Sequence, residues 1–419
     1  MTAIIDKTPT WTHQSEKGLQ INSTAINGDG SIVVYGTSSE FDSGNFTFYA
    51  CNAEGQNIFA VPISKQSCYQ GVFWVAVSEQ GGIAAAGGET SKSGPNNGFL
   101  QAYAVTTGAP CLLNETLPGR VNQVSLSADG TYLLATFTEY LDNIESGVLQ
   151  LYQLDNEKTA YQLTDHFSLA GYGFNSCEIS TNGTRAAVSA IAYTDDDKTD
   201  GKVIAFNVDN GKLYRQSDAA LSAGSMRVAV VADGSYWGAS LHDGSCALFT
   251  DSSTTPDSPL WTYQPPDLDL SLAYGFDITK TAAGKVILAV GVNLAENGNA
   301  SSQDPLGRLY LVESVKTSAH EAPELLMIAD IEYSPNPGVS LDTDANYVTA
   351  TDGKPADEHS GGNTDESPGN FYLFDIPAKA QLWQYPTKIM NWPMMISANG
   401  AAIIGGSDTG ELFFWGATG

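Results

Sequence analysis

The chain has 419 residues, of which 42% are hydrophobic and 16% charged, and its 47 acidic residues against 19 Lys and Arg give a net charge of −28. A field of this sign repels nucleic acid phosphates, so DNA and RNA are not expected partners. No run of 18 apolar residues is present and the N-terminus lacks the pattern of a signal peptide. We therefore expect no membrane contact and a cytoplasmic location, with secretion without a recognisable signal as the alternative.

From the N-terminus onward, one pattern recurs: an alternating apolar run, a Gly-centred turn and a second apolar run. The turns end 49 to 61 residues apart, at Gly30, Gly81, Gly130, Gly183, Gly234, Gly284, Ala345 and Gly400. Their Asn-Gly and Asp-Gly pairs are typical of two-residue hairpins, in which both turn residues need positive φ. Eight copies at near-constant spacing predict eight repeated antiparallel units.

Each unit continues with a third strand that a glycine introduces, and seven units have a fourth, clearest at 260–263 and 382–385. The last unit has only three, and the segment Thr10-Trp11-Thr12-His13 resembles its missing fourth strand. Pairing of that segment with the last unit closes a ring and leaves no open sheet edge. The sequence therefore predicts an all-β fold, a single closed β-propeller domain over 1–419 with eight four-stranded blades. Seven blades is the alternative, if insertions in units six and seven conceal a mis-parsed repeat.

No segment has a sustained helical period, and the longest loops join second to third strands, at 89–98, 139–147, 193–201, 293–307 and 352–369. Loops of this kind all emerge on one face of a propeller, and that face typically carries the functional site. Two of them are acidic, at 195–200 and 352–366. Their carboxylates suit calcium, but we interpret them as a solvated acidic rim and expect no cofactor.

The repeated Leu-Trp-x-Tyr, Ser-x-Asp/Asn-Gly and Gly-x-Leu-Tyr-Leu-Phe-Asp motifs, clearest over 369–375 and 382–406, resemble those of quinoprotein-like and WD40-like propellers. The resemblance covers essentially the whole chain and implies the fold, whereas function does not follow from it. Quinone-dependent dehydrogenases of that superfamily typically carry adjacent cysteines near the quinone. This chain has no Cys-Cys pair, so a quinone-dependent dehydrogenase is the least favoured function.

Three charged residues stand out in the first strands, which line the channel of a propeller. They are Glu178, Arg227 and Asp277, in consecutive units four, five and six. One interpretation is an ion cluster between blades that fixes their packing, because buried charges are costly unless paired. The other is a polar site in which the carboxylates act as acid or base, or hold a ligand together with the guanidinium.

Aromatic residues near the same strands predict a hydrophobic rim of ligand-binding side chains: Trp74, Tyr172, Phe174, Tyr274 and Trp392. His242 starts a short turn on the loop face and is a further catalytic candidate, with an ordinary turn histidine as the alternative.

Together these features favour a binding module whose aromatic, acidic-rimmed funnel takes a small molecule or a protein segment. The alternative is a cofactor-free lyase, isomerase or cyclase. In that enzyme Glu178, Asp277 or His242 would transfer protons and Arg227 would stabilise negative charge. Such an enzyme requires Glu178, Arg227 and Asp277 to converge within hydrogen-bond reach.

Overall fold

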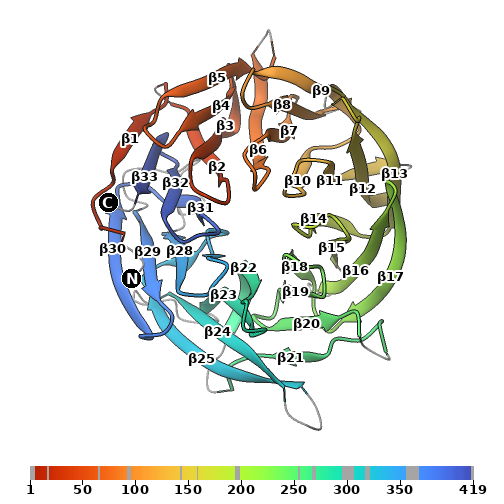
Figure 1. The fold of residues 1–419 in the computed structure, drawn as a ribbon, viewed down its shortest axis with the longest axis vertical. Coiled ribbons are helices and arrows are strands. Elements are labelled where there is room, and N and C mark those ends of the chain that lie inside the picture. The colour runs from red at the N-terminus through yellow and green to blue at the C-terminus, as the bar shows by residue number, and fades with distance from the viewer. Residues whose placement is uncertain are drawn as a thin grey trace.

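The computed structural model describes residues 5–16, 18–64, 67–91, 96–141, 144–157, 159–193, 199–252, 255–266, 270–294, 306–316, 321–354 and 368–416. All helix and strand assignments in these residues are β-strand. The strands form eight antiparallel groups around a central axis, with the first strand of each near the centre and the fourth at the rim (Figure 1). We call these groups blades 1 to 8. The prediction of an all-β propeller is confirmed.

The first four blades follow one another along the chain. Blade 1 contains β2 (Gln20–Ile26), β3 (Ile32–Gly44), β4 (Thr47–Asn52) and β5 (Asn57–Pro62). Blade 2 contains β6 (Cys68–Val77), β7 (Ile83–Glu89), β8 (Gly98–Ala104) and β9 (Ala109–Leu117). Blade 3 contains β10 (Val121–Leu126), β11 (Tyr132–Leu141), β12 (Ile144–Leu154) and β13 (Tyr161–Ala170). Blade 4 contains β14 (Gly173–Ile179), β15 (Arg185–Tyr193), β16 (Thr199–Asp209) and β17 (Lys212–Leu221).

The remaining blades repeat this order, with two variations. Blade 5 contains β18 (Ser225–Val230), β19 (Tyr236–Leu241), β20 (Cys246–Thr250) and β21 (Trp261–Tyr263). Blade 6 contains β22 (Leu270–Lys280), β23 (Val286–Leu294), β24 (Gly307–Lys316) and β25 (Glu321–Ile331). Blade 7 has a divided first strand, β26 (Ser334–Pro335) and β27 (Ser340–Leu341), then β28 (Tyr347–Gly353), β29 (Gly369–Asp375) and β30 (Ala380–Thr387). Blade 8 contains β31 (Asn391–Ile396), β32 (Ala402–Ser407), β33 (Glu411–Gly416) and the N-terminal β1 (Trp11–Gln14).

The N-terminal strand supplies the fourth strand of blade 8, as the repeat count requires. β1 pairs antiparallel with β33 in a register that sets Trp11 opposite Phe414, and their rings stack with centroids 5.0 Å apart. The indole nitrogen of Trp11 also donates to the Ala53 carbonyl in blade 1, at 2.8 Å. This segment therefore joins the last blade to the first, and the N and C labels lie on the same side of Figure 1.

The turns between first and second strands differ from the two-residue hairpins that the sequence predicts. Positive φ occurs at the last residue of each triplet, as at Gly30 (79°) and Ala345 (54°), but not at Gly28 or Asp29. Because only one residue is left-handed, these are longer loops in which Gly30 N donates to Asn27 O at 3.1 Å. Neighbouring loops are tied together by backbone hydrogen bonds, such as Gly28 N to Glu79 O at 2.9 Å.

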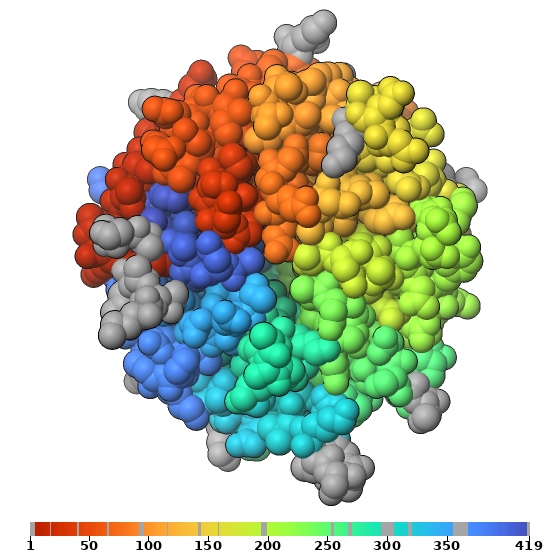
Figure 2. Space-filling view, in the orientation of Figure 1, coloured from red at the N-terminus to blue at the C-terminus, as the bar shows by residue number. Residues whose placement is uncertain are grey.

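Hydrophobic clusters lie between successive blades. The cluster between blades 7 and 8 includes Trp415, which is fully buried against Phe371 and Trp383 at centroid distances of 5.3 and 5.5 Å. In space-filling view the blades meet as adjacent sectors around the centre (Figure 2). No helix among the described residues is long and apolar enough to cross a membrane.

The first strands share one irregularity that decides what faces the channel. In seven blades the register between first and second strands shifts by at least one residue, for example between Val72 and Trp74 and between Phe174 and Ser176. An extra residue reverses the alternation of side chains along the strand. Two residues that simple alternation would place on the same face of the strand therefore point to opposite faces when the bulge lies between them.

Candidate functional site

Two cavities lie in series along the axis. We call them the mouth chamber, at the end from which the long loops leave, and the deep chamber below it. Their volumes are about 270 Å³ and 230 Å³. Five residues line both chambers and so form the partition between them: Trp74, Arg227, Tyr274, Pro337 and Pro393.

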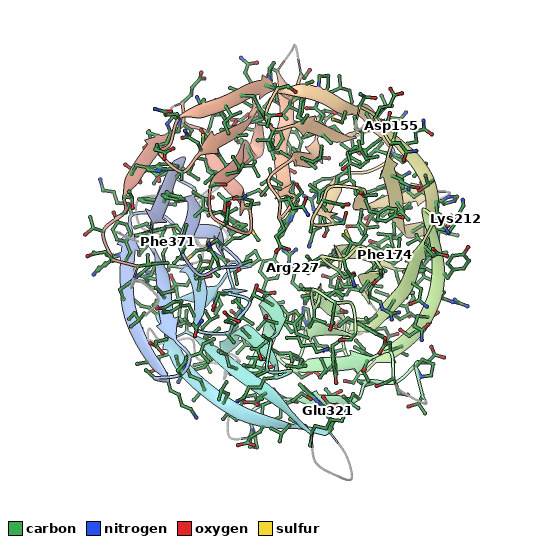
Figure 3. All side chains as sticks on the ribbon, in the orientation of Figure 1. Asp155, Phe174, Lys212, Arg227, Glu321 and Phe371 are labelled. Carbon is green, nitrogen blue, oxygen red and sulfur yellow. The ribbon has the colours of Figure 1, made fainter. Side chains whose placement is uncertain are left out.

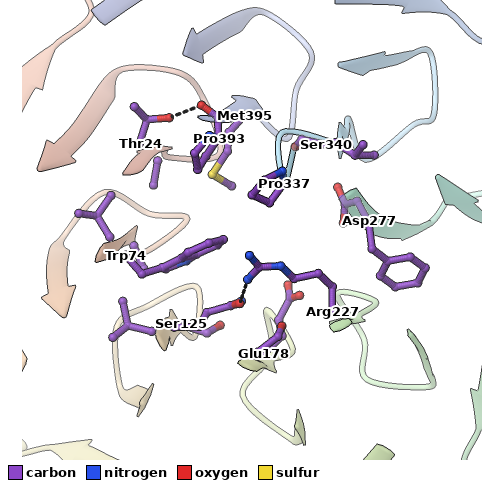
Figure 4. Close-up of a pocket in the computed structure, with 18 of the residues that line it drawn as sticks. Thr24, Trp74, Ser125, Glu178, Arg227, Asp277, Pro337, Ser340, Pro393 and Met395 are labelled. Carbon is purple, nitrogen blue, oxygen red and sulfur yellow. Dashed lines mark hydrogen bonds between the residues drawn. The ribbon is translucent and has the colours of Figure 1, made fainter. Parts of the chain in front are cut away.

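Arg227 crosses this partition from β18. Its guanidinium carbon lies 4.7 Å from the ring centroid of Trp74 and 5.0 Å from that of Tyr274. Its Nη1 donates to Gln123 Oε1 at 3.1 Å, and the Gln123 amide is itself fixed by donating to the Cys177 carbonyl at 2.9 Å. Figure 3 places Arg227 near the centre of the ring, and Figure 4 shows its head group reaching toward Trp74.

The charge of Arg227 has no anionic partner in the described part of the chain. The residue is only 8% exposed, no carboxylate there lies within 4.0 Å of its nitrogens, and its Nε has no hydrogen-bond acceptor. The two aromatic rings compensate part of the desolvation cost by cation–π attraction. A buried charge that lacks a counter-ion is nevertheless costly, and such a group favours an anion from outside the chain.

The two carboxyl groups predicted for the site lie in the deep chamber. Asp277 accepts from its neighbour Ile278 N through Oδ1 and from Leu341 N of blade 7 through Oδ2, both at 2.7 Å. Burial raises the pKa of Asp277 to about 7, although these two hydrogen bonds oppose the shift. Burial and, secondarily, the charge of Asp277 raise the pKa of Glu178 well above its ordinary value.

These carboxyls occupy a position that blades 3 and 7 fill with serine. Ser125 Oγ accepts from Ile179 N of the next blade at 3.2 Å, and Ser340 Oγ accepts from Ile396 N at 3.4 Å. Asp277 makes the same connection to Leu341. Glu178 and Asp277 thus line one cavity with Arg227, as the channel alignment predicts. Neither carboxylate forms an ion pair with the Arg227 guanidinium.

The mouth chamber combines aromatic, amide, hydroxyl and guanidinium groups. Its aromatic walls come from Phe73, Trp74, Tyr274 and Trp392, and the bulges of β6 and β22 turn Phe73 and Tyr274 inward. Blade 1 contributes Asn22, Ser38 and Ser39. Arg120 lies over the Phe73 ring at 4.1 Å and donates to Asn122 and Gln70. No Asp or Glu is among its described lining residues.

Three sequence-predicted residues lie elsewhere. Phe174 precedes the bulge of β14, so it points between blades 3 and 4, where it is fully buried and stacks on Phe167 at 6.2 Å. Its predicted place on the rim is therefore wrong, because it lines neither chamber. Tyr172 packs half-buried against the same cluster and lines neither chamber. His242 also lines neither chamber. Its backbone N–H donates to Gly224 O, and its carbonyl accepts from Leu272 N.

The predicted acidic rim falls mostly outside the described residues, which exclude 194–198 and 355–367. The first acid of the second stretch, Asp352, is not in a loop. It is the last residue but one of β28 and is fully buried, accepting from Tyr372 Oη at 2.7 Å and from Asn370 N at 2.6 Å. Within the described ranges, no three His, Cys, Asp or Glu side chains gather in a way that would hold a metal ion.

Comparison with known proteins gives matches among solved structures and none by sequence. No family model matches the chain, and no curated protein does. Among solved structures, the β-propeller domain of Cps50 (Swd1) from Myceliophteria thermophila is similar, with 12% identity and a TM-score of 0.49. The alignment covers 83% of this chain and 96% of that one. A likeness at this level carries no information about function.

Sequence reasoning missed the side chains that hold Arg227 and complete the mouth chamber. Gln123 is the channel residue of blade 3, and only its register after the bulge shows that it meets Arg227. Arg120 directly precedes the first strand of blade 3, which was a usable signal in a chain with only 19 Lys and Arg. Ser38 gave no signal, because it lies on a second strand.

Proposed function

We propose that the protein is a ligand-binding propeller whose mouth chamber takes a small monocarboxylate with an apolar or aromatic body. The carboxylate pairs with Arg227, and the body packs against the walls of Trp74, Tyr274 and Trp392. The observation that carries this proposal is the buried guanidinium of Arg227, which faces the chamber and has no anionic partner among the described residues. A planar guanidinium matches a carboxylate with two parallel hydrogen bonds.

Charge and size favour a small monoanion over the acidic segment of a protein. The net charge of −28 repels any anion that approaches, and the repulsion grows with the charge that the partner carries. Salt at physiological strength screens this field beyond about 8 Å, so a compact monoanion inside the chamber meets mainly Arg227 and Arg120. A volume of about 270 Å³ is at the small end of ligand pockets.

The geometry favours no second function. The acid–base alternative requires Glu178, Arg227 and Asp277 in mutual hydrogen-bond contact. Both oxygens of Asp277 instead accept backbone N–H groups, and Arg227 donates to Gln123.

The replacement Arg227→Met tests the proposal directly. We expect 4-fluorobenzoate to bind the wild-type protein at least about tenfold more tightly than 4-fluorobenzamide, because charge-assisted hydrogen bonds contribute about 1.5–3 kcal/mol. In Arg227→Met this preference should disappear, while the unfolding temperature stays level or rises because an unpaired buried charge is gone. Fluorine NMR titration measures both affinities, and thermal denaturation checks the fold.

The matched control is Arg215→Met on the outer strand β17, whose side chain is 58% exposed. This variant has the same loss of charge but should bind 4-fluorobenzoate as the wild type does. Equal binding of acid and amide by the wild type, or an acid preference that survives in Arg227→Met, would contradict the proposed function.

A further inference from the structure

We infer that the ligand of the mouth chamber is a hydroxylated carboxylate of monosaccharide size, such as a hexuronate. This inference rests on the proposed function and names its ligand class. Arg227 takes the carboxylate, and the hydroxyl groups bond to Asn22 and Ser38 on blade 1.

Four unpaired polar atoms belong to residues that line this chamber. Among the described residues, the buried atoms Asn22 Oδ1, Ser38 Oγ, Arg227 Nε and Trp392 Nε1 have no hydrogen-bond partner. All four residues line the mouth chamber, and Ser38 is only 5% exposed. A buried polar atom left unpaired costs about 1–3 kcal/mol, so groups of this kind are expected to be satisfied in the working state.

The chemistry of these atoms selects hydroxyl groups on the ligand. Asn22 Oδ1 accepts a hydrogen bond, since its amide nitrogen already donates to Gln20 Oε1 at 3.2 Å. Ser38 Oγ accepts or donates, and Trp392 Nε1 only donates. A hydroxyl group satisfies each of these. An ammonium group would lack a carboxylate partner, because no Asp or Glu is among the described residues that line the chamber.

The arrangement of the blades places these groups around one small ring. In a ring of eight blades, blade 1 lies opposite blade 5. The strands that carry Asn22 and Ser38 therefore lie across the axis from the strand that carries Arg227. Blades 2 and 8 flank blade 1 and supply Trp74 and Trp392. A pyranose ring has apolar C–H faces and hydroxyls at its edge, so its faces can pack on the indoles while its edge meets blade 1. Because the four polar atoms are buried, contact with a ligand requires small side-chain rotations.

Three probes separate the two parts of the recognition. Cyclohexanecarboxylate carries the charge and ring alone, glucose carries the hydroxyls alone, and glucuronate carries both. We expect glucuronate to bind the wild-type protein at least about tenfold more tightly than either of the others, because each hydroxyl pairs an otherwise unsatisfied atom. Isothermal titration calorimetry gives the three affinities under one set of conditions.

The variant Ser38→Ala isolates the contribution of blade 1. We expect it to weaken glucuronate binding by about three- to tenfold while leaving cyclohexanecarboxylate binding unchanged. Its unfolding temperature should stay level or rise, which distinguishes a ligand contact from a structural one. Ser31→Ala, an exposed position in the turn at the other end of blade 1, is the matched control and should bind all three probes as the wild type does.

The outcomes distinguish this inference from the function on which it rests. If cyclohexanecarboxylate binds in an Arg227-dependent manner and glucuronate binds no more tightly, the hydroxylated ligand is wrong and the proposed function stands. If no carboxylate binds, both are wrong. If glucose binds as tightly as glucuronate, the pairing of a ligand carboxylate with Arg227 is overturned, and the inference with it.

Discussion

Deletion of residues 1–14 is expected to open the ring and to cost at least about 5 kcal/mol of stability. The deletion removes the hydrogen bonds of β1 to β33, the stack of Trp11 on Phe414, and two backbone acceptors of buried indoles. Those acceptors are Ile5 O for Trp383 and Lys7 O for Trp415. The exposed edge of β33 should then pair with other chains, because an unpaired strand edge is a template for association. Denaturant titration and light scattering measure the two effects.

Graded variants and a rescue experiment make this expectation specific. Trp11→Ala should cost about 2–3 kcal/mol, below the range for a fully buried aromatic, because its side chain is half-buried. Thr12→Ala on the exposed side of the same strand should be within about 0.5 kcal/mol of wild type. A peptide of residues 1–16 added to the truncated chain should restore its unfolding temperature. A truncated chain that stays monomeric and as stable as the wild type would show that the N-terminal strand does not close the ring.

Replacement of Asp277 by serine is expected to remove a pH dependence of stability of about 2–3 kcal/mol between pH 5 and pH 8.5. Burial raises the pKa of Asp277 from 3.8 to about 7, so the folded state favours the protonated form. The stabilisation is complete below the unfolded pKa and is lost as the pH rises through the folded pKa. The raised pKa of Glu178 acts in the same direction.

Serine is the informative replacement because blades 3 and 7 use it for the same connection to the next blade. Asp277→Ser keeps an acceptor for Leu341 N but cannot ionise. Urea denaturation of the wild type and the variant at both pH values gives the difference in their pH dependence of stability. The pH dependence that all other titratable groups contribute is common to both proteins and cancels. If both proteins lose the same stability between pH 5 and pH 8.5, burial does not raise the pKa of Asp277.

Most of the fold could be predicted from the repeat period of the sequence. Eight turns ending at Gly30 and its equivalents favoured eight blades over the alternative of seven, and the likeness of the Trp11 segment to a fourth strand indicated how the last blade is completed. The details of the turns did not follow, because Asn-Gly and Asp-Gly suit several loop lengths. Only the observed φ values show that a single residue of each triplet is left-handed.

The site was predicted in part, and a bulge explains why Phe174 does not belong to it. Trp74, Tyr274 and Trp392 face the mouth chamber, and Glu178, Arg227 and Asp277 line the channel. Phe174 is separated from the channel-facing Ser176 by one extra residue, and strict alternation cannot reveal that insertion. The partner of Arg227 is Gln123 rather than a carboxylate, because contacts between non-adjacent blades depend on side-chain reach across the axis.

The join between blades 8 and 1 also bears on what happens when the mouth chamber fills. Asn22 and Ser38 stand on one side of that join, and Trp392 stands on the other. The covalent break in the ring lies inside blade 8, between β33 and β1, so a molecule that contacts all three residues would bridge the N-terminal and C-terminal parts of the chain. Binding of the proposed ligand would therefore stabilise the closed ring, and docking of β1 would in turn favour ligand binding, by mass action.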